Sequence, residues 1–265
     1  MEVLTLEQVK DSLLSMLIAL DEYCKRNSLR YYLCGGALIG AIRHKGFIPW
    51  DDDIDVLMPR PDYERFIKIS KDDCVSPNYI TLSYKNSNSN LIFAKLANKR
   101  LRVENKYQIE EEYVSIDIFP LDGISNNKVL AKMNYRRIDL LRSIYGLKLW
   151  KYGVATKKSI RIAKKIAYPI TKIIDHKKLC LKMDKIAQTS SFEESNLVGD
   201  IIWGYGEREI MPKEKFLEQI DVEFEGHKFI TTKYYHEYLS KVYGDYMKLP
   251  PMEKRKNHEL KVYRI

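Results

Sequence analysis

A run of alternating acidic and apolar residues constrains the fold of this chain more than any other feature. The run reads Pro49-Trp-Asp-Asp-Asp-Ile-Asp-Val56, and residues 53–58 alternate with the two-residue period of a β-strand. Side chains two positions apart on a strand point to the same face, so Asp53 and Asp55 lie side by side while Ile54 points into the core. The pattern predicts a sheet with one buried face and one acidic face.

Two neighbouring carboxylates predict a metal site at this strand. Each carboxylate raises the pKa of the other unless a cation compensates their charge. A hard divalent ion, Mg²⁺ or Mn²⁺, that keeps open positions for phosphate oxygens is the natural compensation. The alternative is a solvated acidic turn or a calcium loop. The EF-hand version of that loop is excluded because, counting from Asp51, position six is Val56 rather than Gly and position twelve is Asp62 rather than Glu.

A pair of glycines and a third acid complete the predicted site. Gly35 and Gly36 follow the apolar stretch 30–34, expected to be a strand, and precede the expected helix 37–43. Glycines let the backbone approach a ligand, and the N–H groups at a helix start favour an anion. Asp117 lies in the short apolar stretch 114–119, where an acid without a partner would be costly. We expect it on a strand beside residues 53–58, where it would be a catalytic and metal-binding residue; the alternative is a structural Asp paired with Arg or a backbone N–H.

The order of the expected elements predicts an α/β (α+β) fold, with a mixed central sheet flanked by helices. Helices are expected at 4–25, 37–43, 62–69 and 234–243, and strands at 30–34, 53–58, 80–84, 91–97, 114–119, 222–224 and 227–230. The strand 114–119 is expected to stop at Pro120 and an Asp122-Gly123 turn. We predict a catalytic core at 1–125, a basic helical insertion at 126–190, with breaks near Gly153 and Pro169, and a C-terminal part at 191–265 that completes the catalytic domain.

Charge is concentrated in one part of the chain. Residues 128–185 hold 17 Lys or Arg and three acids, a charge of +14, whereas the whole chain carries +9, so the remainder is −5. The four cysteines form no close pair, which indicates reduced thiols in a cytoplasmic protein. We also see no secretory signal and no apolar stretch long enough to span a membrane.

The acidic run and two later stretches resemble the LicD family of the nucleotidyltransferase superfamily. The resemblance lies in Gly35-Gly-Ala-Leu-Ile-Gly-Ala-Ile-Arg-His-Lys-Gly-Phe-Ile-Pro-Trp-Asp-Asp-Asp-Ile-Asp55, in Ser115-Ile-Asp-Ile-Phe-Pro-Leu-Asp122 and in Tyr243-Gly-Asp-Tyr-Met-Lys-Leu-Pro-Pro251. It implies a nucleotidyltransferase-type sheet and bound Mg²⁺ or Mn²⁺. No stretch within residues 128–185 resembles a motif of this family, so the resemblance implies no role for that segment.

The resemblance also implies an activity and its partners. Such proteins move a phospho-alcohol from a CDP-alcohol to a sugar hydroxyl of a cell-surface glycan precursor and release CMP. In bacteria the glycan is a teichoic acid, a capsule or a lipopolysaccharide, and the group is phosphocholine or a similar one; the animal relatives, the fukutin group, transfer ribitol phosphate. The acceptor is expected to be lipid-linked.

Several further residues are candidates for substrate binding. Arg43 and His44 lie between the glycines and the acids, where they could neutralise a diphosphate; a solvated loop is the alternative. Lys95 interrupts an apolar run, so it needs a partner: it could grip a phosphate or lie on the solvent face of an edge strand. Aromatic residues could form a wall of the alcohol pocket or belong to the core. They are Trp203, Tyr205 and Tyr246.

Two functions of other classes remain as alternatives. A nucleotidyltransferase would use the same acids on an NTP and release pyrophosphate. A nucleic-acid-binding module would use the basic segment, but it leaves the predicted acids unexplained, so we expect no nucleic acid partner. The basic segment itself is either a solvated face or a contact with an anionic membrane leaflet, which would place the protein peripherally on the inner face of the cell membrane.

Overall fold

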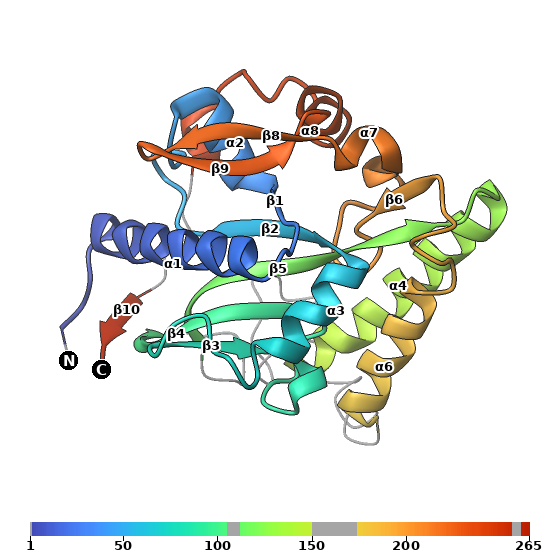
Figure 1. Ribbon diagram of the computed structural model, residues 1–265, viewed down its shortest axis with the longest axis horizontal. Helices are drawn as coiled ribbons and strands as arrows, with labels where there is room; N and C mark the ends of the chain where they lie inside the picture. Colours follow the sequence, from blue (N-terminus) through green and yellow to red (C-terminus); the bar gives the residue numbers. More distant parts are fainter. Residues whose placement is uncertain (1, 105–111, 150–173, 256–260) are drawn as a thin grey trace.

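One mixed sheet organises the chain, as seen in the computed structural model, which describes residues 2–104, 112–149, 174–255 and 261–265 (Figure 1). The order of its main strands is β1 (Tyr32–Leu33), β2 (Ile54–Pro59), β5 (Glu112–Ile124), β4 (Ala94–Glu104) and β10 (Lys261–Arg264), and β3 (Tyr79–Leu82) also pairs with β4. The pair β2–β5 is parallel, and the other pairs named are antiparallel. The predicted α/β (α+β) class is confirmed.

The helices cover the sheet in three groups (Figure 1). On one face lie α1 (Leu6–Arg26) and α3 (Arg60–Ile69), and beyond the β1 edge lie α2 (Gly35–His44), α7 (Lys213–Leu217), α8 (Tyr235–Tyr243) and the hairpin of β8 (Gln219–Phe224) and β9 (His227–Thr232). The third group is the packed pair α4 (Lys128–Leu149) and α6 (His176–Ala187). Short 3₁₀ turns are η1 (Tyr84–Asn86), η2 (Gly206–Glu209) and η3 (Met252–Lys254).

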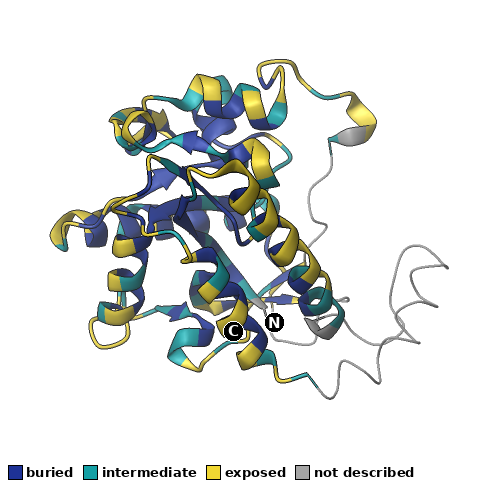
Figure 2. Cartoon of the chain, turned by 90° about the vertical axis from the view of Figure 1, so that its right-hand side faces the viewer, coloured by how far each residue is buried: buried dark blue, intermediate teal, exposed yellow. Residues whose placement is uncertain are grey.

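Local sequence explains where α1 begins and which side it buries. The side chain of Thr5 accepts a hydrogen bond from the backbone N–H of Gln8, and the Gln8 side chain accepts one from the backbone N–H of Thr5, which together form a capping box. Apolar residues at helical spacing form one buried stripe of this helix. They include Val9, Leu13, Met16, Leu17 and Leu20. Figure 2 shows the buried residues of the whole chain as a dark interior.

The predicted end of the strand 114–119 is wrong, because β5 runs through Pro120 to Ile124. Pro120 is paired with Met58 in the parallel ladder, and Asp122 to Ile124 then pair with β6 (Leu197–Gly199), which also pairs with β7 (Met211–Pro212). Gly123 is therefore not a turn residue. A Cβ at this position would lie 2.7 Å from the carbonyl oxygen of Ser191, so the glycine permits a close approach of two backbones.

A buried charge network joins α3, β5 and α6. Arg60 donates two parallel hydrogen bonds to the Asp122 carboxylate, at 2.6 and 2.8 Å, and a third to Asp184 on α6 at 2.9 Å. Lys85 also pairs with Asp184, at 2.9 Å. Because both acids are buried, their charge must be balanced inside the protein. This network fixes α6 against the central sheet.

The described part of the basic segment is helical, as predicted. Residues 128–149 form α4 and residues 176–187 form α6, whereas the breaks expected near Gly153 and Pro169 lie outside the described residues. Of the helices that the structure describes, none combines the length and the apolar character needed to cross a bilayer. The division into segments 1–125, 126–190 and 191–265 stays a prediction.

Candidate active site

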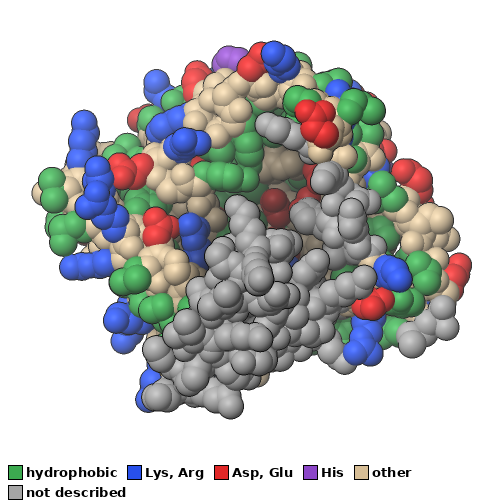
Figure 3. Space-filling model, turned by 180° about the vertical axis from the view of Figure 1, so that it is seen from behind, with side chains coloured by type: hydrophobic (Ala, Val, Ile, Leu, Met, Phe, Trp, Pro, Cys, Tyr) green, Lys and Arg blue, Asp and Glu red, His purple; other side chains and the backbone are tan. Residues whose placement is uncertain are grey.

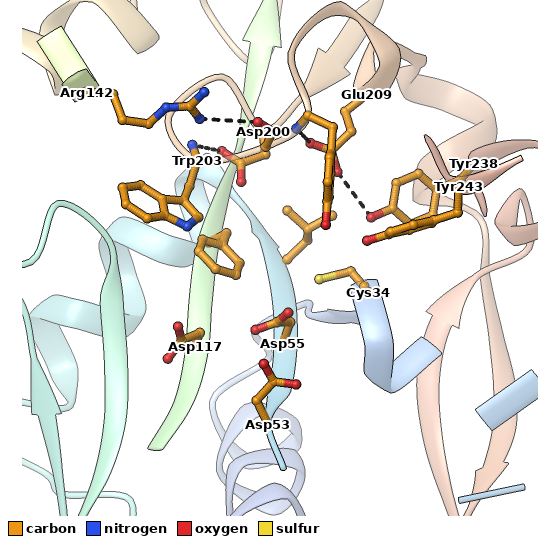
Figure 4. Close-up of a pocket in the computed structure, with 15 residues that line it drawn as sticks. Cys34, Asp53, Asp55, Asp117, Arg142, Asp200, Trp203, Glu209, Tyr238 and Tyr243 are labelled. Carbon is orange, nitrogen blue, oxygen red and sulfur yellow. Dashed lines mark hydrogen bonds between the residues drawn. The ribbon is translucent and has the colours of Figure 1, made fainter. Parts of the chain in front are cut away.

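Asp53 and Asp55, from the acidic run at residues 49–56, lie near the third predicted acid, Asp117, at the centre of the sheet. Asp55 on β2 and Asp117 on β5 are register partners in the parallel ladder, and Asp53 directly precedes β2. The apolar residues between them, such as Ile54 and Ile116, are fully buried on the other face. All three acids line one pocket of about 570 Å³, as Figure 4 shows. The expectation that Asp117 lies on a neighbouring strand in register is confirmed.

The pocket opens on the face of the sheet opposite to α1 and α3. In Figure 3, which views the molecule from behind, this face is hollowed and acidic side chains lie at the floor of the hollow. Burial, followed by repulsion from Asp53 and Asp117, raises the pKa of Asp55 well above its ordinary value. The cluster therefore has an excess of negative charge that a bound cation would relieve.

Lys95 is part of this cluster, and its partner is Asp117. The two residues are opposite each other in the β4–β5 ladder, and Lys95 Nζ lies 3.0 Å from Asp117 Oδ1. The ammonium group lowers the pKa of Asp55 against the effect of the acids, and it lies 5.7 Å from the centre of the Phe93 ring. Lys95 is thus held at the site rather than on the solvent face of an edge strand. A direct phosphate contact from it stays a prediction.

The two glycines lie where the backbone of α2 meets the acids. Gly35 has a φ of +56°, and a Cβ built there would lie 2.9 Å from Asp55 Oδ2. A Cβ on Gly36 would lie 2.5 Å from Asp51 Oδ2. Side chains are therefore excluded sterically, and the start of α2 lies against the carboxylates. Gly35 itself lines the pocket, so the start of α2, the end of a helix that favours an anion, faces this cavity.

The chemistry of these donors fits a hard divalent cation. Asp53 and Asp55 offer carboxylate oxygens in a site that is short of positive charge, which suits Mg²⁺ or Mn²⁺. Within the described ranges, no three His, Cys, Asp or Glu side chains are already gathered in the spacing of a metal site. Asp117 is engaged by Lys95, so its carboxylate would have to share that contact to act as a third ligand.

Five predicted substrate-binding residues are not among those that line the pocket: Gly36 and Lys95, which lie beside the acids, and Arg43, His44 and Tyr246. Arg43 donates hydrogen bonds to the carbonyl oxygen of Tyr246, at 2.7 Å, and to Nε2 of His44, at 2.9 Å. The Tyr246 hydroxyl lies 2.9 Å from Nδ1 of His236. These contacts tie the end of α2 to the segment after α8, because a guanidinium group with several donors can bind backbone carbonyls. The predicted contacts of Arg43, His44 and Tyr246 with substrate gain no support from this placement.

Aromatic residues wall part of the pocket. Trp203 and Tyr205, two of the three predicted for such a wall, line it, whereas Tyr246 does not (Figure 4). The sequence reasoning missed nine lining residues: Cys34, Leu57, Phe119, Arg142, Asp200, Gly204, Glu209, Tyr238 and Tyr243. One available signal was Asp200, an acid directly before the apolar pair Ile201-Ile202, where burial demands a partner.

Comparison with known proteins gives one family and a relative that matches throughout. Residues 28–174 match the family described as "LicD/FKTN/FKRP, nucleotidyltransferase domain". The lipopolysaccharide cholinephosphotransferase LicD of Haemophilus influenzae is 32% identical over 275 residues, which cover 98% of each chain. An uncharacterized protein of Rickettsia typhi is 27% identical over 47% of this chain and 39% of its own length. One of Rickettsia prowazekii is 26% identical over 42% of this chain and 45% of its own. The Haemophilus likeness thus extends over both the acid cluster and the aromatic wall.

Proposed function

The chain belongs to the LicD family of nucleotidyltransferase-fold proteins, and on that basis we propose that it transfers phosphocholine from CDP-choline to a sugar hydroxyl of a lipopolysaccharide or similar glycan precursor. The observation that carries the proposal is the register pair Asp55–Asp117, which lines one pocket with Asp53 and the glycine start of α2. A phosphoryl transfer site needs N–H donors that bind the phosphate oxygens and carboxylates that hold the metal, and both must lie at the same point. The named activity of the Haemophilus relative supports phosphocholine, rather than ribitol or glycerol phosphate, as the group that moves.

The proposed reaction is a single in-line displacement at phosphorus. The oxygen of the acceptor hydroxyl forms a bond to the phosphorus that carries choline, the bond from this phosphorus to the bridging oxygen breaks, and CMP leaves with that oxygen. The proton of the hydroxyl passes to a carboxylate of the cluster. The backbone N–H groups at the start of α2 would bind the phosphate oxygens.

Each charged residue of the cluster has a role in this proposal. Asp53 and Asp55, with Asp117, would hold Mg²⁺ or Mn²⁺, which supplies charge stabilisation to the transferred phosphoryl group. Lys95 holds the Asp117 carboxylate in place and adds positive charge beside the phosphate. The raised pKa of Asp55, caused first by burial and then by the neighbouring acids, is what a bound divalent cation would relieve.

Helices α4 and α6 support a second part of the proposal, contact with an anionic membrane that presents a lipid-linked acceptor. Val129 and Leu140 on α4 have exposed fractions of 67% and 65%, and basic residues such as Lys132 and Arg136 accompany them. In Figure 3 lysine and arginine side chains lie beside hydrophobic ones at the edge formed by these helices. Basic and apolar side chains on one helix suit the headgroup region of a bilayer.

A donor panel tests the proposed reaction. The purified protein is incubated with Mg²⁺ or Mn²⁺, a lipopolysaccharide acceptor and one of CDP-choline, CDP-ribitol, CDP-glycerol or CTP, and both CMP and pyrophosphate are measured. The proposal predicts acceptor-dependent release of CMP from CDP-choline. Pyrophosphate release from CTP, without CMP from any CDP-alcohol, would instead identify a nucleotidyltransferase and overturn the proposal.

A further inference from the structure

The pocket has a second half, away from the three catalytic carboxylates, that is walled by aromatic rings. Tyr205 and Tyr243 meet edge to face, with ring centres 5.3 Å apart. The ring centre of Trp203 lies 5.3 Å from that of Phe93, and the ring centre of Phe93 lies 4.6 Å from that of Phe119, both pairs in a tilted arrangement. These ring contacts support the wall from behind.

Two buried acidic residues line the pocket beside the aromatic wall. Asp200 and Glu209 have exposed fractions of 4% each, and both line the pocket. Asp200 Oδ1 accepts hydrogen bonds from the backbone N–H groups of Ile202 and Trp203, at 3.0 and 2.9 Å. Glu209 Oε2 accepts one from the backbone N–H of Tyr205 at 2.7 Å, and its Oε1 accepts one from the Tyr238 hydroxyl at 3.2 Å. The acids thus orient the loop that carries the aromatic residues.

Two acidic residues and one basic residue line this half of the pocket. Arg142 is the basic residue among the described residues that line the pocket. Its guanidinium donates hydrogen bonds to the Gly204 carbonyl oxygen and to Asp139. It also lies 5.9 Å from the centre of the Trp203 ring. Burial, and repulsion by Asp200, raise the pKa of Glu209 to about 8, and burial raises the pKa of Asp200 to about 6. Two acids face one arginine, and a cation bound beside them would favour the ionised form of both carboxyl groups.

We propose that Glu209, Asp200, Trp203, Tyr205 and Tyr243 form the site that binds the quaternary ammonium end of the transferred alcohol. The inference rests on the proposed function, which it deepens by assigning donor selectivity to residues outside the acidic sequence run. The phosphorus end of the same donor would lie at Asp53, Asp55 and the start of α2. Because one cavity joins the two halves, a short phospho-alcohol can occupy both.

The chemistry of the wall favours a quaternary ammonium over a polyol. A trimethylammonium group has no N–H to donate, so it needs aromatic faces and negative charge rather than hydrogen-bond acceptors. Ribitol and glycerol carry no positive charge, so they gain neither the attraction of the ring faces nor that of the acids, which a trimethylammonium group gains.

The test compares two donors on matched variants. Affinities for CDP-choline and CDP-glycerol are measured by calorimetry for wild type, Glu209→Gln, Tyr205→Leu and Tyr205→Phe. Glu207→Gln, a change in the same short η2 helix at a residue that does not line the pocket, is the control. We expect Glu209→Gln and Tyr205→Leu to weaken CDP-choline binding about tenfold and to leave CDP-glycerol binding within about twofold. Tyr205→Phe, which keeps the ring, should weaken CDP-choline binding much less than Tyr205→Leu.

Choline itself serves as a second probe. Saturation-transfer NMR on its methyl protons tests the ammonium site without the nucleotide, so loss of the signal in Glu209→Gln supports the site even if no CMP release is found and the proposed function fails. An equal loss of affinity for CDP-choline and CDP-glycerol in the variants would show that Glu209 and Tyr205 only maintain the structure of the loop. That result, or CDP-choline and choline binding unchanged in both variants, would overturn the inference, and circular dichroism excludes unfolding as the cause.

Discussion

Asp55 and Asp117 are register partners on two adjacent parallel strands, so strand pairing brings together two acids that are far apart along the chain. Lys95 stands opposite Asp117 on the next strand of the same sheet. Three strands thus deliver two carboxylates and one ammonium group to one row across the sheet. Side chains placed on a sheet in this way have little freedom to move, which favours a precisely arranged reaction centre.

Asp55→Asn should lower the transfer rate by at least about 100-fold, because the carboxylate charge is lost at the reacting phosphorus. The same change should not lower the temperature of unfolding, since it removes a charge whose burial is unfavourable. Mn²⁺ binding, followed by electron paramagnetic resonance, should weaken in parallel. Asp52→Asn is the matched control, as Asp52 belongs to the same run and does not line the pocket. Wild-type transfer by Asp55→Asn would exclude the proposed centre.

Gly35→Ala should displace the Asp55 carboxylate and lower activity on the order of 100-fold. The added Cβ would lie 2.9 Å from Asp55 Oδ2, and the φ of +56° is strained for alanine by about 1–2 kcal/mol. Gly146→Ala is the control, because a Cβ there meets no atom within 4 Å, and it should leave activity unchanged. Steady-state kinetics of the two variants measures the difference, and equal activity would contradict the close approach of α2.

Arg60→Met should lower the free energy of unfolding by about 3–5 kcal/mol, because Asp122 is left buried with no guanidinium partner. The exposed pair Arg26–Asp73, at 3.5 Å, provides the comparison, and Arg26→Met should cost at most about 0.5 kcal/mol. Urea denaturation of both variants gives the two values. Similar small losses of unfolding free energy in both variants would mean that the buried network adds little stability. Adding Asp122→Asn to Arg60→Met should recover part of the lost free energy.

Stability should fall as the pH rises from about 5 to 8, because the pKa of Glu209 in the folded protein is about 8 and its ordinary value is 4.5. The folded state then binds more protons than the unfolded state in this window, and deprotonation favours unfolding. Several groups face Glu209 or act on its charge and belong to the same titration. They are Asp200, Arg142, Tyr238, Tyr243, Tyr135 and Cys34.

The check on this pH effect is Glu209→Gln, which removes the titrating carboxyl and keeps an oxygen for the Tyr205 N–H. Thermal unfolding of this variant should show a flatter dependence on pH between 5 and 8 than wild type. An unchanged slope would assign the effect to other buried acids, of which Asp55 is the first to examine.

Vesicle binding tests the proposed membrane contact. The protein should sediment with vesicles that contain phosphatidylglycerol and be released as salt rises, because screening weakens the attraction of exposed charges. The double change Lys132→Glu and Arg136→Glu on α4 should reduce binding, whereas phosphatidylcholine vesicles should bind little of either protein. Equal binding to both kinds of vesicle, or none to either, would rule the contact out.

Local sequence was sufficient for the parts of the site that lie on one strand or one helix turn. The alternation at residues 53–58 predicted which face of β2 carries Asp55, because the two-residue period belongs to the strand itself. The glycine pair at the start of α2 and the capping box of α1 are equally local. The start of β2 differs from its predicted position by one residue and that of β4 by three. The predicted ends of β4 and β5 were wrong, because β4 continues from residue 97 to Glu104 to pair with β10, and β5 continues to pair with β6.

Tertiary structure decided which distant residues complete the site. The ion pair of Lys95 with Asp117 depends on the register of two strands. The placement of Asp200, Glu209 and Tyr243 in the pocket depends on how the C-terminal segment packs over the sheet. No local period encodes such contacts, because they arise when residues far apart in the chain bury surface together. For the same reason Arg43, next to the acids in sequence, turns away to hold the backbone at Tyr246.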